Sequence, residues 1–112
     1  AELIQNKIPL VTSDFILDET ITFIFKRLGF REASSYFSGI FASIEKGAIQ
    51  LIPITSERFR KAWLLRLQFS DKPEISFTDL TSFVIMKELG IHEVVTDDRH
   101  FDIVNWGFLR IK

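Results

Sequence analysis

Residues 75–101, ISFTDLTSFVIMKELGIHEVVTDDRHF, form the stretch that decides the fold. Within it, Ser76-Phe77-Thr78-Asp79 has the pattern of a capping box, which marks the start of a helix. A glycine ends that helix, and the apolar run at 93–96 then predicts a short buried strand. One carboxylate, Asp79, therefore lies in the first turn of a helix, and another, Asp98, lies just past a strand.

Helices and strands are predicted to alternate along the rest of the chain. Apolar residues recur at helical spacing over 14–28, 31–45 and 56–68, while shorter apolar runs at 10–12, 48–54 and 108–111 predict strands. This alternation favours a three-layer α/β/α fold with a mostly parallel sheet covered on both faces. A length of 112 residues predicts a single domain.

Composition excludes several classes of protein. The net charge of −1 argues against a global basic field that would recruit nucleic acid. The absence of cysteine rules out disulfides and thiolate metal sites, and it is compatible with the cytoplasm, where we expect the protein to act. No apolar run approaches the roughly 20 residues of a membrane span. The basic residues of the third helix are expected to form a solvated face: Arg58, Arg60, Lys61 and Arg66.

Three carboxylates are predicted to converge at one edge of the sheet. In an open parallel sheet, ligands bind beyond the carboxyl ends of the strands. Asp98 follows one strand end, Asp79 begins a helix, and Glu19 lies about a turn and a half into the helix after the first strand. Such a cluster repels itself unless a cation neutralises it, and Mg²⁺ or Mn²⁺ suits oxygen ligands. Water held by that ion could attack a phosphodiester.

Each acid also has a purely structural interpretation. Asp79 could serve only as a capping acid at the positive end of its helix. Glu19 is aligned with Phe15 and Phe23, and a carboxylate on a buried apolar row would need a basic partner. Asp98 could belong to a solvated turn, as could the preceding aspartate, and both histidines are expected in surface loops. These alternatives stay open.

The motifs together resemble those of PIN-domain ribonucleases, most closely the VapC-like members of toxin–antitoxin pairs. The similarity rests on the order and spacing of TSDFILDET at 12–20, SFTD at 76–79 and TDDRHF at 96–101. The resemblance implies a Mg²⁺- or Mn²⁺-dependent endoribonuclease whose catalytic and metal-binding acids fall on Glu19, Asp79 and Asp98. The family pattern favours Asp98 over its neighbour, with Thr96 as a minor contributor.

The resemblance also implies an RNA substrate, a small antitoxin partner, a homodimer and no membrane association. It departs at the start, because the family opens with an interior strand that carries a further catalytic Asp. Residues 1–7 correspond to the end of the helix after that strand. We therefore expect residues 1–112 to be an N-terminally incomplete PIN-like domain. The missing strand would leave unpaired ladder groups, unless a partner chain, a separate fragment or a swapped element fills the gap.

Two other functions remain as alternatives. The chain could be a non-catalytic PIN-like interaction module whose metal site is incomplete. It could also be a flavodoxin-like binder of small molecules, which ranks lowest because the sequence has no phosphate-binding loop.

Overall fold

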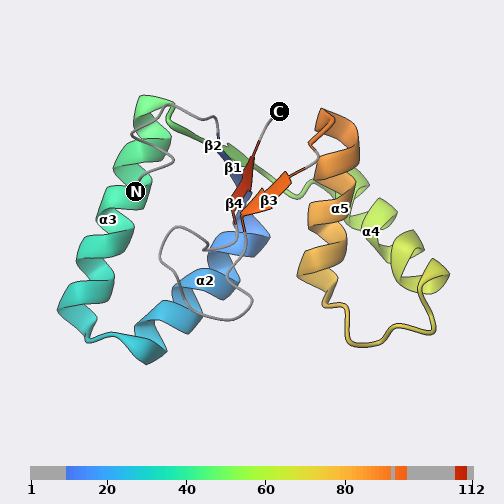
Figure 1. The fold of residues 1–112 in the computed structure, drawn as a ribbon, viewed down its shortest axis with the longest axis horizontal. Helices are drawn as coiled ribbons and strands as arrows, with labels where there is room; N and C mark the ends of the chain where they lie inside the picture. The colour runs from blue at the N-terminus through green and yellow to red at the C-terminus, as the bar shows by residue number, and fades with distance from the viewer. Residues whose placement is uncertain (1–9, 92, 96–107, 111–112) are drawn as a thin grey trace.

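The computed structural model describes residues 10–91, 93–95 and 108–110. The elements follow in the order β1 (Leu10–Ser13), α2 (Asp14–Arg27), α3 (Phe30–Lys46), β2 (Ile49–Ile52), α4 (Ser56–Gln68), α5 (Phe77–Leu89), β3 (Glu93–Val95) and β4 (Phe108–Arg110). The sheet lies in the middle, with α2 and α3 on one side and α4 and α5 on the other (Figure 1). This arrangement confirms the predicted three-layer α/β/α fold.

The sheet has the strand order β2-β1-β4-β3. β1 pairs with β2 in parallel, so that Leu10 lies opposite Ile49. β4 runs antiparallel to both β1 and β3, which leaves β1, β2 and β3 pointing in one direction. The prediction of a mostly parallel sheet therefore holds for strand direction, and β4 is the inverted strand.

β4 occupies the interior position beside β1. In that position Leu10 pairs with Arg110, and Val11 pairs with Leu109. In the described sheet β1 therefore has a partner strand on each side.

Alternating side chains of β1 supply both faces of the sheet. Leu10 packs against α2 and α3, in a core cluster with Leu17, Ile24, Ala33, Phe37, Ile40 and Ile49. Val11, the next residue, packs on the opposite face with Ile52, Ile85 and Ile91. Successive side chains of a strand point to opposite faces, so one short strand anchors both helical layers.

Helices α4 and α5 pack against each other through a third apolar cluster. Ala62 and Leu80 are fully buried there, and Val84 lies beside them. In the part of the chain that the structure describes, no helix combines the length and the apolar character needed to cross a membrane.

Candidate active site at the carboxyl edge of the sheet

Three helices begin at the edge of the sheet where β1, β2 and β3 end. α2 follows β1 directly, and α4 follows β2 after three residues. α5 ends just before β3 begins, at the opposite edge, and its 13 residues span about 20 Å. Its first turn therefore lies back at the carboxyl edge, beside the starts of α2 and α4.

A chain of aromatic rings joins these three helix starts. The ring of Phe15, in the first turn of α2, meets the ring of Phe59 in α4 edge-on, with their centroids 6.2 Å apart. The ring of Phe59 in turn lies 4.9 Å from that of Phe77, the first residue of α5. Each such pair contributes about 0.5–1.5 kcal/mol beyond its buried area. The rings therefore hold together helix starts that come from distant parts of the sequence.

Each of these helices begins with a hydroxyl cap. The side-chain oxygens of Ser13, Thr55 and Ser76 accept hydrogen bonds from the backbone N–H groups of Ile16, Arg58 and Asp79, at 3.1, 3.2 and 3.0 Å. Free N–H groups and the helix dipole give a helix start a partial positive charge. Three such starts at one edge favour an anionic ligand there, such as the phosphate groups of a nucleic acid.

Asp79 lies at the third position of α5, and it is exposed. The predicted capping role of Ser76 is confirmed, because its oxygen accepts the N–H of Asp79. The carboxylate of Asp79 faces solvent at the carboxyl edge, so it is accessible to a metal ion. Capping by its neighbour and ligand binding by Asp79 are therefore compatible.

Glu19 is also exposed, so the alternative in which it lies on a buried row beside a basic partner does not hold. The row that it shares with two phenylalanines is not buried: Phe15 is half-buried, and Phe23 is 40% exposed beneath the guanidinium of Arg27. A solvated carboxylate needs no basic partner, and the ion pairs among the described residues do not include Glu19. Its carboxylate is thus accessible in the second turn of α2.

Asp14 has a role at this edge that the sequence did not reveal. Its Oδ1 accepts hydrogen bonds from the backbone N–H of Phe15 at 2.9 Å and from that of Ile54 at 3.0 Å. The second bond joins the start of α2 to the chain just after β2. The position of this acid directly after a strand end was a signal that could have identified the role.

The predicted three-acid set is only partly within the described structure. Asp98 lies outside the described residues, as do Thr96, Asp97 and both histidines. Among the residues that are described, no three His, Asp or Glu side chains are close enough to hold a metal ion. The metal set of Glu19, Asp79 and Asp98 therefore stays a prediction. Exposed carboxylates on separate elements fit a hard divalent cation that keeps several waters.

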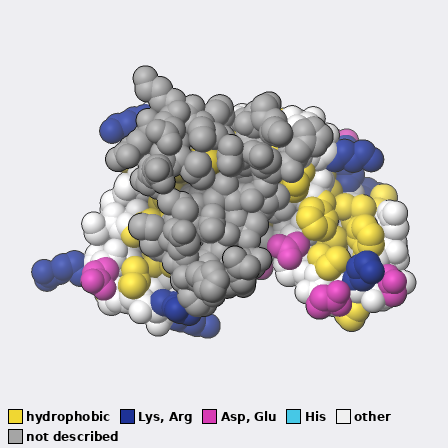
Figure 2. Space-filling model, in the orientation of Figure 1, with side chains coloured by type: hydrophobic (Ala, Val, Ile, Leu, Met, Phe, Trp, Pro, Cys, Tyr) yellow, Lys and Arg dark blue, Asp and Glu magenta, His cyan; other side chains and the backbone are white. Residues whose placement is uncertain are grey.

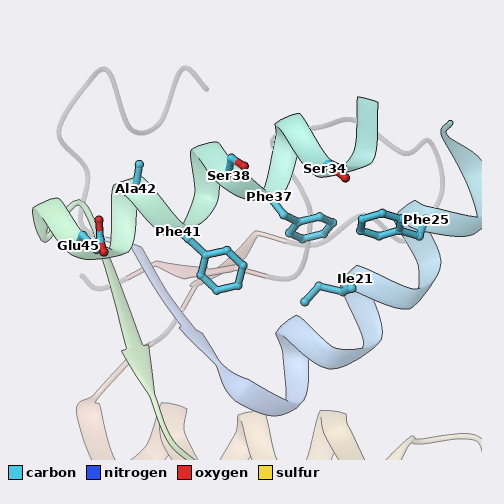
Figure 3. Close-up of a pocket in the computed structure, with 8 residues that line it drawn as sticks. All are labelled: Ile21, Phe25, Ser34, Phe37, Ser38, Phe41, Ala42 and Glu45. Carbon is cyan, nitrogen blue, oxygen red and sulfur yellow. The ribbon is translucent and has the colours of Figure 1, made fainter. Parts of the chain in front are cut away.

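A separate cavity of about 560 Å³ lies between α2 and α3 (Figure 3). Ile21, Phe25, Phe37 and Phe41 point toward it, and Glu45 is the one titratable side chain in its lining. The lining is mainly apolar and holds one acid, so the cavity does not supply a group of carboxylates that could bind a catalytic divalent ion. The carboxyl edge remains the candidate active site.

Comparison with known proteins identifies the family. No protein-family model matches the chain. Two curated relatives, both named 23S rRNA-specific endonuclease VapC20, come from Mycobacterium tuberculosis strains CDC 1551 / Oshkosh and ATCC 25618 / H37Rv. Each is 30% identical over 108 residues, which are 96% of this chain and 77% of the relative. Together with the three ordered motifs and the α/β/α fold, this similarity shows that the chain belongs to the VapC-like family of PIN-domain ribonuclease toxins.

Proposed function

We propose that the protein is a divalent-metal-dependent endoribonuclease, the toxin of a toxin–antitoxin pair, and that it acts in the cytoplasm. The observation that carries this proposal is the 30% identity over 96% of the chain to relatives named as endonucleases specific for 23S rRNA. The carboxyl edge supports it, because exposed acids and three helix starts lie there. We propose structured RNA as the substrate class, and ribosomal RNA is the first substrate to test.

Within this proposal, Glu19, Asp79 and Asp98 hold Mg²⁺ or Mn²⁺. A bound ion of this kind lowers the pKa of its water and stabilises the charge that develops on the phosphate. The protein's own contribution is to place the acids and to orient the RNA backbone. The N-termini of α2, α4 and α5 favour phosphate at the same edge.

Metal dependence and two substitutions test the proposal. We expect cleavage of ribosomal RNA in Mg²⁺ or Mn²⁺ and its loss in EDTA. Asp79→Asn and Asp98→Asn should each lower cleavage at least 100-fold while leaving the circular dichroism spectrum unchanged. Asp71→Asn is the matched control, because Asp71 is an exposed acid in the α4–α5 loop. Cleavage that persists unchanged in EDTA would refute the mechanism.

An exposed apolar face on α4 and α5 favours an additional, protein-binding role. Figure 2 shows hydrophobic side chains gathered over this half of the molecule. The large apolar residues of α4 and α5 that are exposed include Trp63, at 50%, and Leu64, at 57%, together with Phe59, Leu67 and Phe83. Large apolar side chains that gather on one exposed face are typical of protein–protein interaction sites.

A second copy of the chain is the occupant that we propose for this face. The groove between α4 and α5 carries Lys61, Lys87 and Glu88 beside its apolar residues. A two-fold interface brings the same patch together from both subunits, so a patch with both charge signs can complement itself. A standard interface buries about 800 Å² per partner, which an apolar centre with a charged rim can supply.

The mass in solution tests the dimer. Light scattering after size exclusion should give twice the mass of one chain, and Leu64→Glu should give the mass of one. Ser35→Glu, an exposed change on α3, should leave the dimer intact. A wild-type monomer at micromolar concentration would contradict the proposal. A small antitoxin that inhibits cleavage is the other protein partner that we propose, on the basis of family membership.

A further inference from the structure

The guanidinium of Arg66 binds three backbone carbonyl groups in the loop between α4 and α5. Its Nη1 donates to the carbonyl oxygen of Ile75 at 2.6 Å, and its Nη2 donates to those of Phe69 at 2.9 Å and Lys72 at 2.7 Å. The three acceptors are spaced three residues apart. One half-buried side chain near the end of α4 therefore binds the loop that leads to α5 at three points, and we call this set of hydrogen bonds the Arg66 clamp.

The loop is shaped to present these carbonyls to one side. The N–H of Lys72 donates to the carbonyl of Phe69 at 3.0 Å, and the N–H of Ile75 donates to that of Lys72 at 3.2 Å. The side chains of Phe69 and Ile75 pack against the α4–α5 core. Two successive turns thus point their apolar side chains toward the core and their carbonyl groups toward the guanidinium of Arg66.

A guanidinium suits these three carbonyl groups better than an ammonium. Its planar group presents five N–H donors in fixed directions, so two nitrogens can reach acceptors that lie apart. Hydrogen bonds from a charged donor are also stronger than those between neutral groups. A lysine at position 66 would place one nitrogen among the same carbonyls and would satisfy them only in part.

We propose that Arg66 is a positioning residue for the catalytic edge, acting through Asp79. Ile75, whose carbonyl it holds, directly precedes Ser76, the cap of α5. Ser76 in turn accepts the N–H of Asp79 at 3.0 Å. The clamp therefore sets where α5 begins, and hence where the carboxylate of Asp79 lies at the carboxyl edge. This inference rests on the proposed metal-dependent function, in which Asp79 is a ligand.

In the described structure, the other arginines of α4 do not bind the loop between α4 and α5. Arg58 binds Glu88 at 3.0 Å and the carbonyl of Pro53 at 2.8 Å, so it joins the start of α4 to the residue after β2 and to the end of α5. Arg60 is exposed on the same helix. Because Arg60→Ala removes the same charge from the same helix without disturbing the loop, it is the matched control for Arg66→Ala.

Calorimetric titration with Mn²⁺ and steady-state cleavage of ribosomal RNA test the proposal. Both are measured on the protein well below the unfolding midpoint of each variant. We expect Arg66→Ala to weaken Mn²⁺ binding about tenfold and to lower kcat about tenfold, with KM for RNA within twofold. Arg66→Lys should recover part of both losses, and Arg60→Ala should match the wild type. Wild-type Mn²⁺ affinity in a folded Arg66→Ala protein would overturn the inference.

Two further measurements separate this inference from the proposed function. Millimolar guanidinium should restore part of the Mn²⁺ affinity of Arg66→Ala, and it should not affect Arg60→Ala. Hydrogen exchange of the amides at 70–79 should be faster in Arg66→Ala than in the control, whether or not the protein binds metal. Absence of Mn²⁺ binding by the wild-type protein would contradict the proposed function. Unchanged hydrogen exchange at 70–79 in Arg66→Ala would contradict the structural role of Arg66. If Arg66→Ala does not fold, Arg66→Gln and Arg66→Lys provide the same comparison.

Discussion

The carboxylate of Asp14 accepts a hydrogen bond from the backbone N–H of Ile54 at 3.0 Å, across 40 residues of sequence. The same oxygen accepts the N–H of Phe15 at 2.9 Å. One side chain thus joins the start of α2 to the segment after β2. Because both segments leave the sheet at its carboxyl edge, this bond holds part of the edge in place.

Asp14→Ala should therefore destabilise the protein by about 1–2 kcal/mol, since an amide loses its charged acceptor. Asp14→Asn keeps an acceptor oxygen and should cost less than half as much. Urea unfolding followed by tryptophan fluorescence measures both values. Equal stability of Asp14→Ala and the wild type would show that the bond contributes nothing measurable.

Glu19→Gln should weaken Mn²⁺ binding at least tenfold, because the amide is uncharged and is a poorer ligand for a hard cation. Its neighbour Asp18→Asn is the control, since Asp18 is also exposed. Both changes should alter the free energy of unfolding by less than about 0.5 kcal/mol, as is usual for exposed positions. Equal Mn²⁺ affinities for the two variants would remove Glu19 from the metal set.

Leu80→Ala should cost about 2–5 kcal/mol of stability, because Leu80 is fully buried between α4 and α5 and its truncation leaves a cavity. Leu80 directly follows Asp79, so this variant also shows how much the core next to the candidate site contributes to the stability of the protein. Leu28→Ala, at a position that is 38% exposed, should cost about 1 kcal/mol or less. Chemical denaturation of both variants measures the difference. A smaller loss at Leu80 than at Leu28 would contradict the described core.

Tyr36 should ionise only at strongly alkaline pH in the folded protein. Burial raises the pKa of its hydroxyl above the ordinary value of 10.0. Since the folded pKa lies above the unfolded one, this contribution to stability is fully present below about pH 10 and is lost as the pH rises toward the folded value. Tyr36 is the only tyrosine of the chain, so absorbance near 295 nm follows it alone. Ionisation with a midpoint near pH 10 in the folded state would refute the prediction.

Much of the fold could be predicted because its signals are local. A helix cap depends on residues within about four positions of each other, and the predicted start of α5 at Ser76 is confirmed. Its predicted end is confirmed as well, since Gly90 has a left-handed φ of 68°, which favours glycine. The buried strand at Leu10 and Val11 was likewise recognisable from its apolar run.

The candidate site was less predictable, because exposure and contact depend on distant segments. Helical spacing aligned Glu19 with Phe15 and Phe23, but Glu19 itself is exposed, so the alternative of a buried carboxylate with a basic partner does not hold. Arg66 was expected on a solvated face. A basic residue in the last turn of a helix often binds nearby carbonyls, and this was the signal that could have identified its role.

The sequence by itself determined the helices, their caps, the layered fold class and the motifs that resemble the PIN family. Only the tertiary structure decided that β4 lies antiparallel between β1 and β3. The alternation of side chains along a strand has the same period in either direction, and it does not specify which strand will be its neighbour. Only the tertiary structure also joined Phe15, Phe59 and Phe77 into one chain of rings. Local propensities arise from neighbours along the backbone, whereas pairing and ring contacts arise from packing between segments that meet only when the chain folds.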